Sequence, residues 1–151
     1  MKEHTYNLHE HLTQHYTLRE MLYSPTAQRL GMLNPIDSPV VVDNLRLLCD
    51  QVLEPLRLAM NEPIVVCSGY RSDCLNYVVG GRPDSQHRLG EAVHIYCQDE
   101  WQARFYYDYM RLHLHFDQLH LVHHQESGTW WVHVSYTTRY PLRQETCYQA
   151  R

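Results

Sequence analysis

Three of the twelve histidines have neighbours that suggest a shared site. His94 follows His87 by seven residues and lies in an apolar run over 92–97, and His133 lies in a second such run over 130–137. Side chains along a β-strand alternate between its two faces. The β-branched residues flanking His94 and His133 therefore face a core, and each strand presents one imidazole on the opposite face.

Imidazole groups on non-core faces suit a zinc ion. Zinc binds neutral imidazole nitrogens in tetrahedral geometry, and a catalytic site keeps one position for water, whose pKa the metal lowers to about 7. With twelve histidines in the chain, an exposed or core role remains the simpler interpretation of any single one. The sequence pattern by itself leaves both interpretations open.

Hydrophobic periodicity and turn residues predict the elements that would position these histidines. We expect helices over 17–30, 38–61, 74–79 and 99–112, strands over 64–67, 92–97, 116–123 and 130–137, a hairpin loop over 125–129 and an irregular tail from 138. Helices followed by strands mixed with helices predict an α+β fold, a small antiparallel sheet packed with helices. We expect a single domain over 1–151, with 1–16 and 138–151 peripheral.

Composition narrows the function classes. The net charge of -4 and scattered arginines argue against nucleic acid as a partner. No stretch approaches the roughly 18 apolar residues of a membrane span, and the start lacks a secretory signal, so we expect a protein that is cytoplasmic as synthesised and, if it acts outside, is released by lysis or another route. Five cysteines without a paired motif predict reduced thiols. The oligomeric state stays open.

Ordered segments along most of the chain resemble the zinc D-Ala-D-Ala carboxypeptidases and related phage endolysin peptidases. The similar segments are 17–20, 44–46, 52–57, 68–72, 75–76, 79–81, 85–92, 116–119 and 131–135. This resemblance implies the hedgehog/DD-peptidase fold, a zinc cofactor and hydrolysis of peptidoglycan-type peptides of the cell wall.

The resemblance also implies roles for individual residues. His87 and His133 match the two histidine ligands of the family, and His94 stands where the family has an aspartate, which predicts a three-histidine metal site. Arg71 matches the arginine that holds the substrate carboxylate, although a surface arginine closing a turn is the alternative. Ser85 and Gln118 match polar positions that line the site.

One departure concerns the reaction itself. The family has a catalytic glutamate where this sequence has Val122, and valine cannot transfer a proton. Substitute bases are, in the order we expect, His124, Glu126 and His120, with Tyr96 and Glu91 more distant. Three alternatives follow: an active zinc peptidase, a catalytically degenerate metal- or peptide-binding relative, and a protein that shares only the fold.

Overall fold

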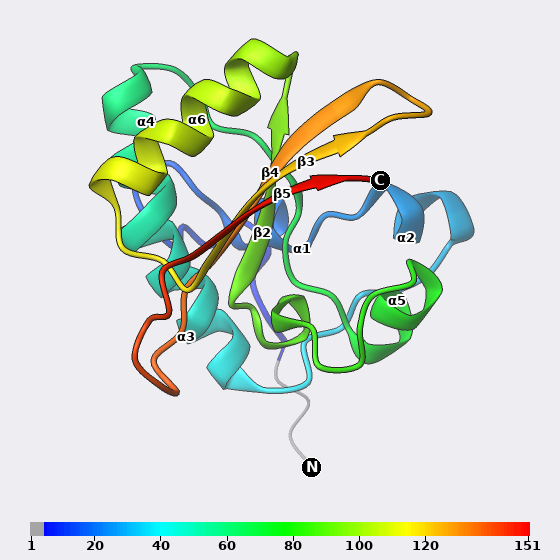
Figure 1. Ribbon diagram of the computed structural model, residues 1–151. Helices are drawn as coiled ribbons and strands as arrows, with labels where there is room; N and C mark the ends of the chain where they lie inside the picture. Colours follow the sequence, from blue (N-terminus) through cyan, green and yellow to red (C-terminus); the bar gives the residue numbers. More distant parts are fainter. Residues whose placement is uncertain (1–4) are drawn as a thin grey trace.

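A five-stranded sheet forms the centre of the computed structural model, which describes residues 5–151 (Figure 1). The strand order is β1-β2-β4-β3-β5, and all neighbours are antiparallel except β3 and β5, which are parallel. The strands are β1 (Val66–Ser68), β2 (Ala92–Cys97), β3 (Gln118–His124), β4 (Thr129–Ser135) and β5 (Glu145–Ala150). The α+β class is therefore confirmed, with a sheet that is mixed.

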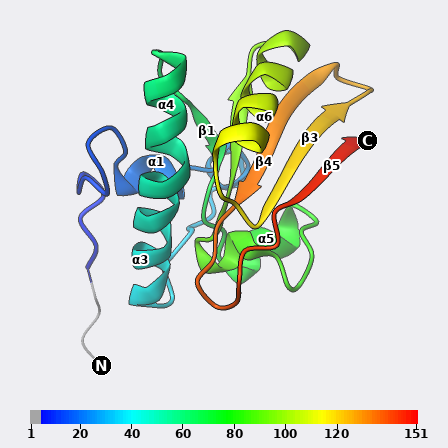
Figure 2. The same ribbon diagram turned by 60° about the vertical axis from the view of Figure 1, so that its left-hand side comes forward.

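The helices lie on both sides of this sheet. In Figures 1 and 2, α3, α4 and α6 lie on one side, and α2 and α5 lie on the other. The α-helices are α1 (Leu18–Leu22), α2 (Pro25–Leu30), α3 (Pro39–Leu48), α4 (Glu54–Met60), α5 (Asp73–Val78) and α6 (Glu100–His113). A π-helical turn (Cys49–Leu53) joins α3 to α4, and a 3-10 helix (Gln86–Leu89) precedes β2.

The hydrophobic core fills the space between the sheet and the layer formed by α3, α4 and α6. Leu45, Leu48 and Leu56 from the helices pack in one cluster with Ile95 and Val132 from the strands. Alternation along each strand then leaves the other sheet face free of this core. That second face carries the histidines of the predicted site.

The predicted helix over 38–61 is observed, with a π-turn in its middle. Ser38 caps its start and Pro39 occupies the first turn, as the sequence indicates. Pro55 has no N–H to donate to the carbonyl four residues earlier, and the Glu54 N–H bonds to the Cys49 carbonyl instead. The helix ends at Asn61 in a left-handed conformation.

The prediction of one helix over 17–30 is wrong. Ser24 caps a new helix at Pro25, and the chain is extended at Tyr23, so the segment forms two short helices. Proline disfavours helical geometry in the residue before it, which explains the break.

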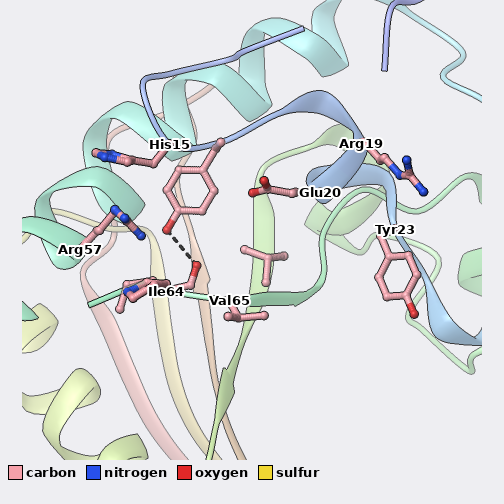
Figure 3. Close-up of a pocket in the computed structure, with 10 residues that line it drawn as sticks. His15, Arg19, Glu20, Tyr23, Arg57, Ile64 and Val65 are labelled. Atoms are coloured by element: carbon pink, nitrogen blue, oxygen red, sulfur yellow. Dashed lines mark hydrogen bonds between the residues drawn. The ribbon is translucent and has the colours of Figure 1, made fainter. Parts of the chain in front are cut away.

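Both chain ends are more integrated than predicted. The expected irregular tail over 138–151 is wrong, because β5 pairs with β3 and makes the sheet mixed. In the N-terminal segment, residues 1–4 lie outside the described residues, while Leu12 and Tyr16 belong to the core. The Tyr16 hydroxyl donates to the Ile64 carbonyl at 2.9 Å, the dashed line in Figure 3.

Candidate functional site

The strand register aligns three histidines across the sheet. His94 on β2 pairs with His133 on β4, and His133 pairs with His120 on β3. We call these three residues the histidine row. Ser68 on β1 and Cys147 on β5 continue the row at its two ends. Paired residues in a sheet point to the same face, so the histidine row shares the face opposite the core.

Two members of this row meet His87, which comes from the 3-10 helix. His87, His94 and His133, the histidine cluster, each offer a ligand atom, and these atoms lie within 4.8 Å of one another. The ring centroid of His87 is 4.6 Å from that of His94 and 5.4 Å from that of His133. The centroids of His94 and His133 are 5.3 Å apart. The structure thus brings together the three residues expected to hold a metal.

Local structure fixes the orientation of His87. Ser85 caps the 3-10 helix by accepting from the His87 N–H, and Gly90 ends the helix in a left-handed conformation. The His87 Nδ1 lies 2.7 Å from the Gly69 carbonyl and donates to it, which leaves Nε2 as the free acceptor. A side chain at Gly69 would collide with the backbone of Met21, so this approach requires glycine.

The cluster fits a metal ion by its own chemistry. The Nε2 atoms of His87 and His133 are buried and have no hydrogen-bond partner among the described residues. Burial, followed by repulsion from Arg71, lowers the pKa of His87 to about 3. Burial and repulsion among the charged forms of the cluster hold the pKa of His94 and His133 well below the usual value. All three rings are therefore neutral near pH 7, the form that binds zinc.

Arg71 lies beside the cluster without an acidic partner. Its Nε donates to the Ser68 hydroxyl at 3.2 Å, and its backbone N–H donates to the His87 carbonyl at 3.0 Å. Within residues 5–151 no carboxylate pairs with it. Burial, then repulsion from Arg151, lowers the pKa of Arg71 to about 10. It stays charged at neutral pH, and its guanidinium remains available to an anion.

The three candidate bases lie at different places. His120 stacks on His133 with centroids 4.9 Å apart, next to the cluster. His124 lies at the hairpin end of β3, where its Nδ1 bonds the Ser127 hydroxyl at 2.7 Å, and Glu126 lies in the exposed loop. Strand geometry puts His124 about 13 Å along β3 from His120. Of the three, only His120 is brought to the cluster.

Val122 lies where the alternation along β3 places it. Leu119 and Leu121 belong to the core, whereas Val122 is 1% exposed and pairs with Trp131 on the histidine face. The Trp131 ring packs 5.8 Å from that of His94. The position where the family has its glutamate therefore carries an apolar side chain next to the cluster.

The remaining predicted residues have structural contacts. The Gln118 side-chain amide donates to Glu145 at 3.3 Å, and Gln118 lies two residues along β3 from His120 on the same face. Glu91 is buried and binds Arg139 and Thr137, away from the cluster. Tyr96 is half exposed and pairs with Trp131.

Sequence reasoning missed the contribution of β5. Gln149 pairs with Val122, and its side-chain nitrogen lies 3.4 Å from the His120 Nδ1. Arg151, one position beyond β5, lies over the Trp131 ring with 6.0 Å to its centroid. The polar composition of this segment gave no strand signal, although Cys147, Gln149 and Arg151 alternate as one strand face would.

A separate cavity lies beside β1, on the side of α1 (Figure 3). Its lining includes three basic side chains, those of His15, Arg19 and Arg57, together with Glu20 and Tyr23. It shares no residue with the histidine cluster. The site argued here therefore depends on the sheet face alone.

Comparison with known families agrees with this geometry. The peptidase M15 family matches residues 14–135, a range that includes the whole histidine cluster. The chain belongs to the peptidase M15 family, which confirms the resemblance to zinc D-Ala-D-Ala carboxypeptidases, and it is a zinc metallopeptidase-like protein. Curated proteins give no match. Within the described part of the chain, no helix has the length and hydrophobicity to cross a membrane.

Proposed function

We propose that this chain is a zinc peptidase that removes the terminal residue from peptidoglycan-type peptides. The observation that carries the proposal is the convergence of His87, His94 and His133 with two buried, unpartnered Nε2 atoms in a member of the M15 family. These three nitrogens would hold the metal. Bound zinc would supply Lewis acidity, polarising the peptide carbonyl and lowering the pKa of water.

Arg71 supports a substrate that ends in a carboxylate. Its guanidinium is fixed by Ser68 at one nitrogen and lacks a carboxylate partner among the described residues. Guanidinium groups bind carboxylates through two parallel hydrogen bonds. In our proposal Arg71 orients the peptide so that its last peptide bond lies at the histidine cluster.

His120 is our candidate for proton transfer, in place of His124 and Glu126. It stacks on His133, and Gln149 lies beside its Nδ1. One of its ring nitrogens would accept a proton from the attacking water and return it to the leaving amine. Gln149 would orient the ring for this exchange.

Val122 favours a second candidate function, a degenerate M15 domain that binds metal and peptide without cleaving it. No carboxylate replaces the missing glutamate at this point of β3, and the tightly packed Val122 side chain leaves no group there for proton transfer. The histidine cluster and Arg71 would remain in such a protein.

An assay of D-Ala release separates the two functions. Protein purified without a metal-affinity column would be loaded with zinc and incubated with an N-acetylated peptide ending in D-Ala-D-Ala. We expect activity in the parent and a loss of roughly a hundredfold or more in His120→Asn, since general-base removal has this size. His124→Asn is the matched control and should stay close to the parent.

Substitution at Val122 supplies the opposite test. An inactive parent together with an active Val122→Glu variant would overturn the active-enzyme proposal and establish the degenerate domain. Val122→Gln has the same shape without the charge and serves as its control. Absence of bound zinc in the parent would overturn both functions.

A further inference from the structure

Arg151 introduces a second unpartnered cation on the histidine face. Its backbone is fixed to β3 from both sides, because its N–H donates to the His123 carbonyl and its carbonyl accepts from Gln125, each at 2.8 Å. Residues alternate along β5, so Arg151 points to the same face as Gln149 and Cys147. In Figure 1 this end of the chain runs beside β3.

The side chain of Arg151 is held over the site. Its Nε and Nη2 donate to the Gln149 side-chain oxygen at 3.2 and 2.7 Å, and its guanidinium lies over Trp131. Gln149 in turn contacts His120. The guanidinium is therefore joined to the histidine row through one glutamine, while its remaining nitrogen stays free of these contacts.

The charge at this face is not balanced by the protein. Neither Arg71 nor Arg151 forms an ion pair with a carboxylate among residues 5–151, and the two repel each other enough to lower the pKa of Arg71. The histidine cluster contributes no negative charge, since His94 replaces the family aspartate. Like charges near one site are stabilised by an anionic ligand.

The two arginines reach the site from opposite edges of the sheet. Arg71 is bonded to Ser68 on β1, and Arg151 extends from β5. A single carboxylate bound by Arg71 would leave Arg151 unpaired. Two carboxylates separated by about two residues of extended peptide, roughly 7 Å, would reach toward both.

We propose that Arg151 is a second carboxylate-binding residue that makes the site selective for peptides with an acidic side chain two residues before their C-terminus. This inference rests on the proposed peptidase function, because Arg71 is taken to hold the terminal carboxylate. Arg151 lies outside residues 14–135, the range matched by the family. The selectivity is thus a property of this chain's own β5 segment.

The test compares two peptides of the same shape, acetyl-Glu-D-Ala-D-Ala and acetyl-Gln-D-Ala-D-Ala. We expect the zinc-loaded protein to favour the glutamate peptide by about tenfold in kcat/KM, the effect of one charged hydrogen bond. In Arg151→Gln the ratio should fall to about one. Arg104→Gln is the matched control, because Arg104 lies on α6 and pairs with Glu100, and it should keep the ratio.

A binding measurement separates this inference from the proposed activity. Calorimetry with the shortened peptides acetyl-Glu-D-Ala and acetyl-Gln-D-Ala needs no turnover and is done with and without zinc. A glutamate preference that Arg151→Gln removes supports the inference even where cleavage is absent, in which case only the peptidase proposal fails. No preference in the parent, or an unchanged preference in Arg151→Gln, overturns the role of Arg151.

Discussion

Two buried polar clusters in this protein differ in how their groups are satisfied. Asp117 is 0% exposed and accepts five hydrogen bonds, three from Arg143, one from Tyr140 and one from Gln86. In the histidine cluster, by contrast, two Nε2 atoms have no partner among the described residues, and the neighbouring Arg71 has no carboxylate.

This difference distinguishes a structural cluster from a binding site. Buried polar groups normally find partners within the protein, because an unsatisfied group costs about 1–3 kcal/mol. The Asp117 network meets this requirement and fastens the segment before β5 to the start of β3. The histidine cluster does not, so a ligand from outside the chain would complete it.

The largest expected effect is the loss of zinc affinity when one ligand is removed. His133→Leu should weaken zinc binding by a hundredfold or more, since even residues that only support a ligand change affinity by about 10–100-fold. Competition with a chelator of known affinity measures the change. His123→Leu, a substitution in β3 at a ring stacked on Trp130 away from the cluster, should retain the parent affinity.

The same variant also tests the comparison between the clusters. Without metal, His133→Leu should unfold within about 1 kcal/mol of the parent, because an apolar group replaces a buried acceptor that has no partner. Asp117→Asn should cost more in the same denaturant titration. A metal-free His133→Leu protein that is several kcal/mol less stable would show that the cluster is structural.

A smaller effect is expected where the backbone supports the cluster. Gly69→Ala would push the chain away from Met21 and displace the carbonyl that fixes the His87 Nδ1. Loss of such a support should weaken zinc binding by about tenfold, with some loss of stability. Gly31→Ala adds a methyl group in open space at another positive φ and serves as the control for backbone strain. Equal zinc affinity in both variants would contradict the support by Gly69.

Strand alternation explains why much of this site could be predicted from the sequence. The runs at 92–97 and 130–137 placed His94 and His133 on the non-core face, and alternation along β3 placed His120 and Val122 beside them. These inferences needed only the two-residue period of a strand and its apolar side. Family resemblance supplied His87, whose helix is too short for a periodic signal.

The contribution of β5 could not be predicted in the same way. Its residues are polar and it lies at a sheet edge, so it has no alternation of buried and exposed groups to detect. Its partner β3 is parallel and is reached through a loop that Arg143 fixes to Asp117. The positions of Gln149 and Arg151 therefore depend on tertiary contacts.

The smallest effect concerns acid stability and belongs to the satisfied cluster. Burial by itself raises the pKa of Asp117, but the hydrogen bonds from Arg143, Tyr140 and Gln86 outweigh it and lower the pKa to about 2. The unfolded value is about 3.9. A lowered carboxyl pKa stabilises the fold fully above about pH 5, and this contribution is lost as pH falls through 3.9 toward 2.

Arg143 sets the size of this effect. Its side chain is 42% exposed, so solvent screens the pair and the contribution is on the order of 1–2 kcal/mol. Urea titrations of the parent and Asp117→Asn should differ by that amount more at pH 6 than at pH 2. Protonation of the histidines at low pH destabilises both proteins equally and cancels in the difference. A difference that does not change with pH would mean that Asp117 contributes through its shape and neutral hydrogen bonds, and that its charge adds nothing to the fold.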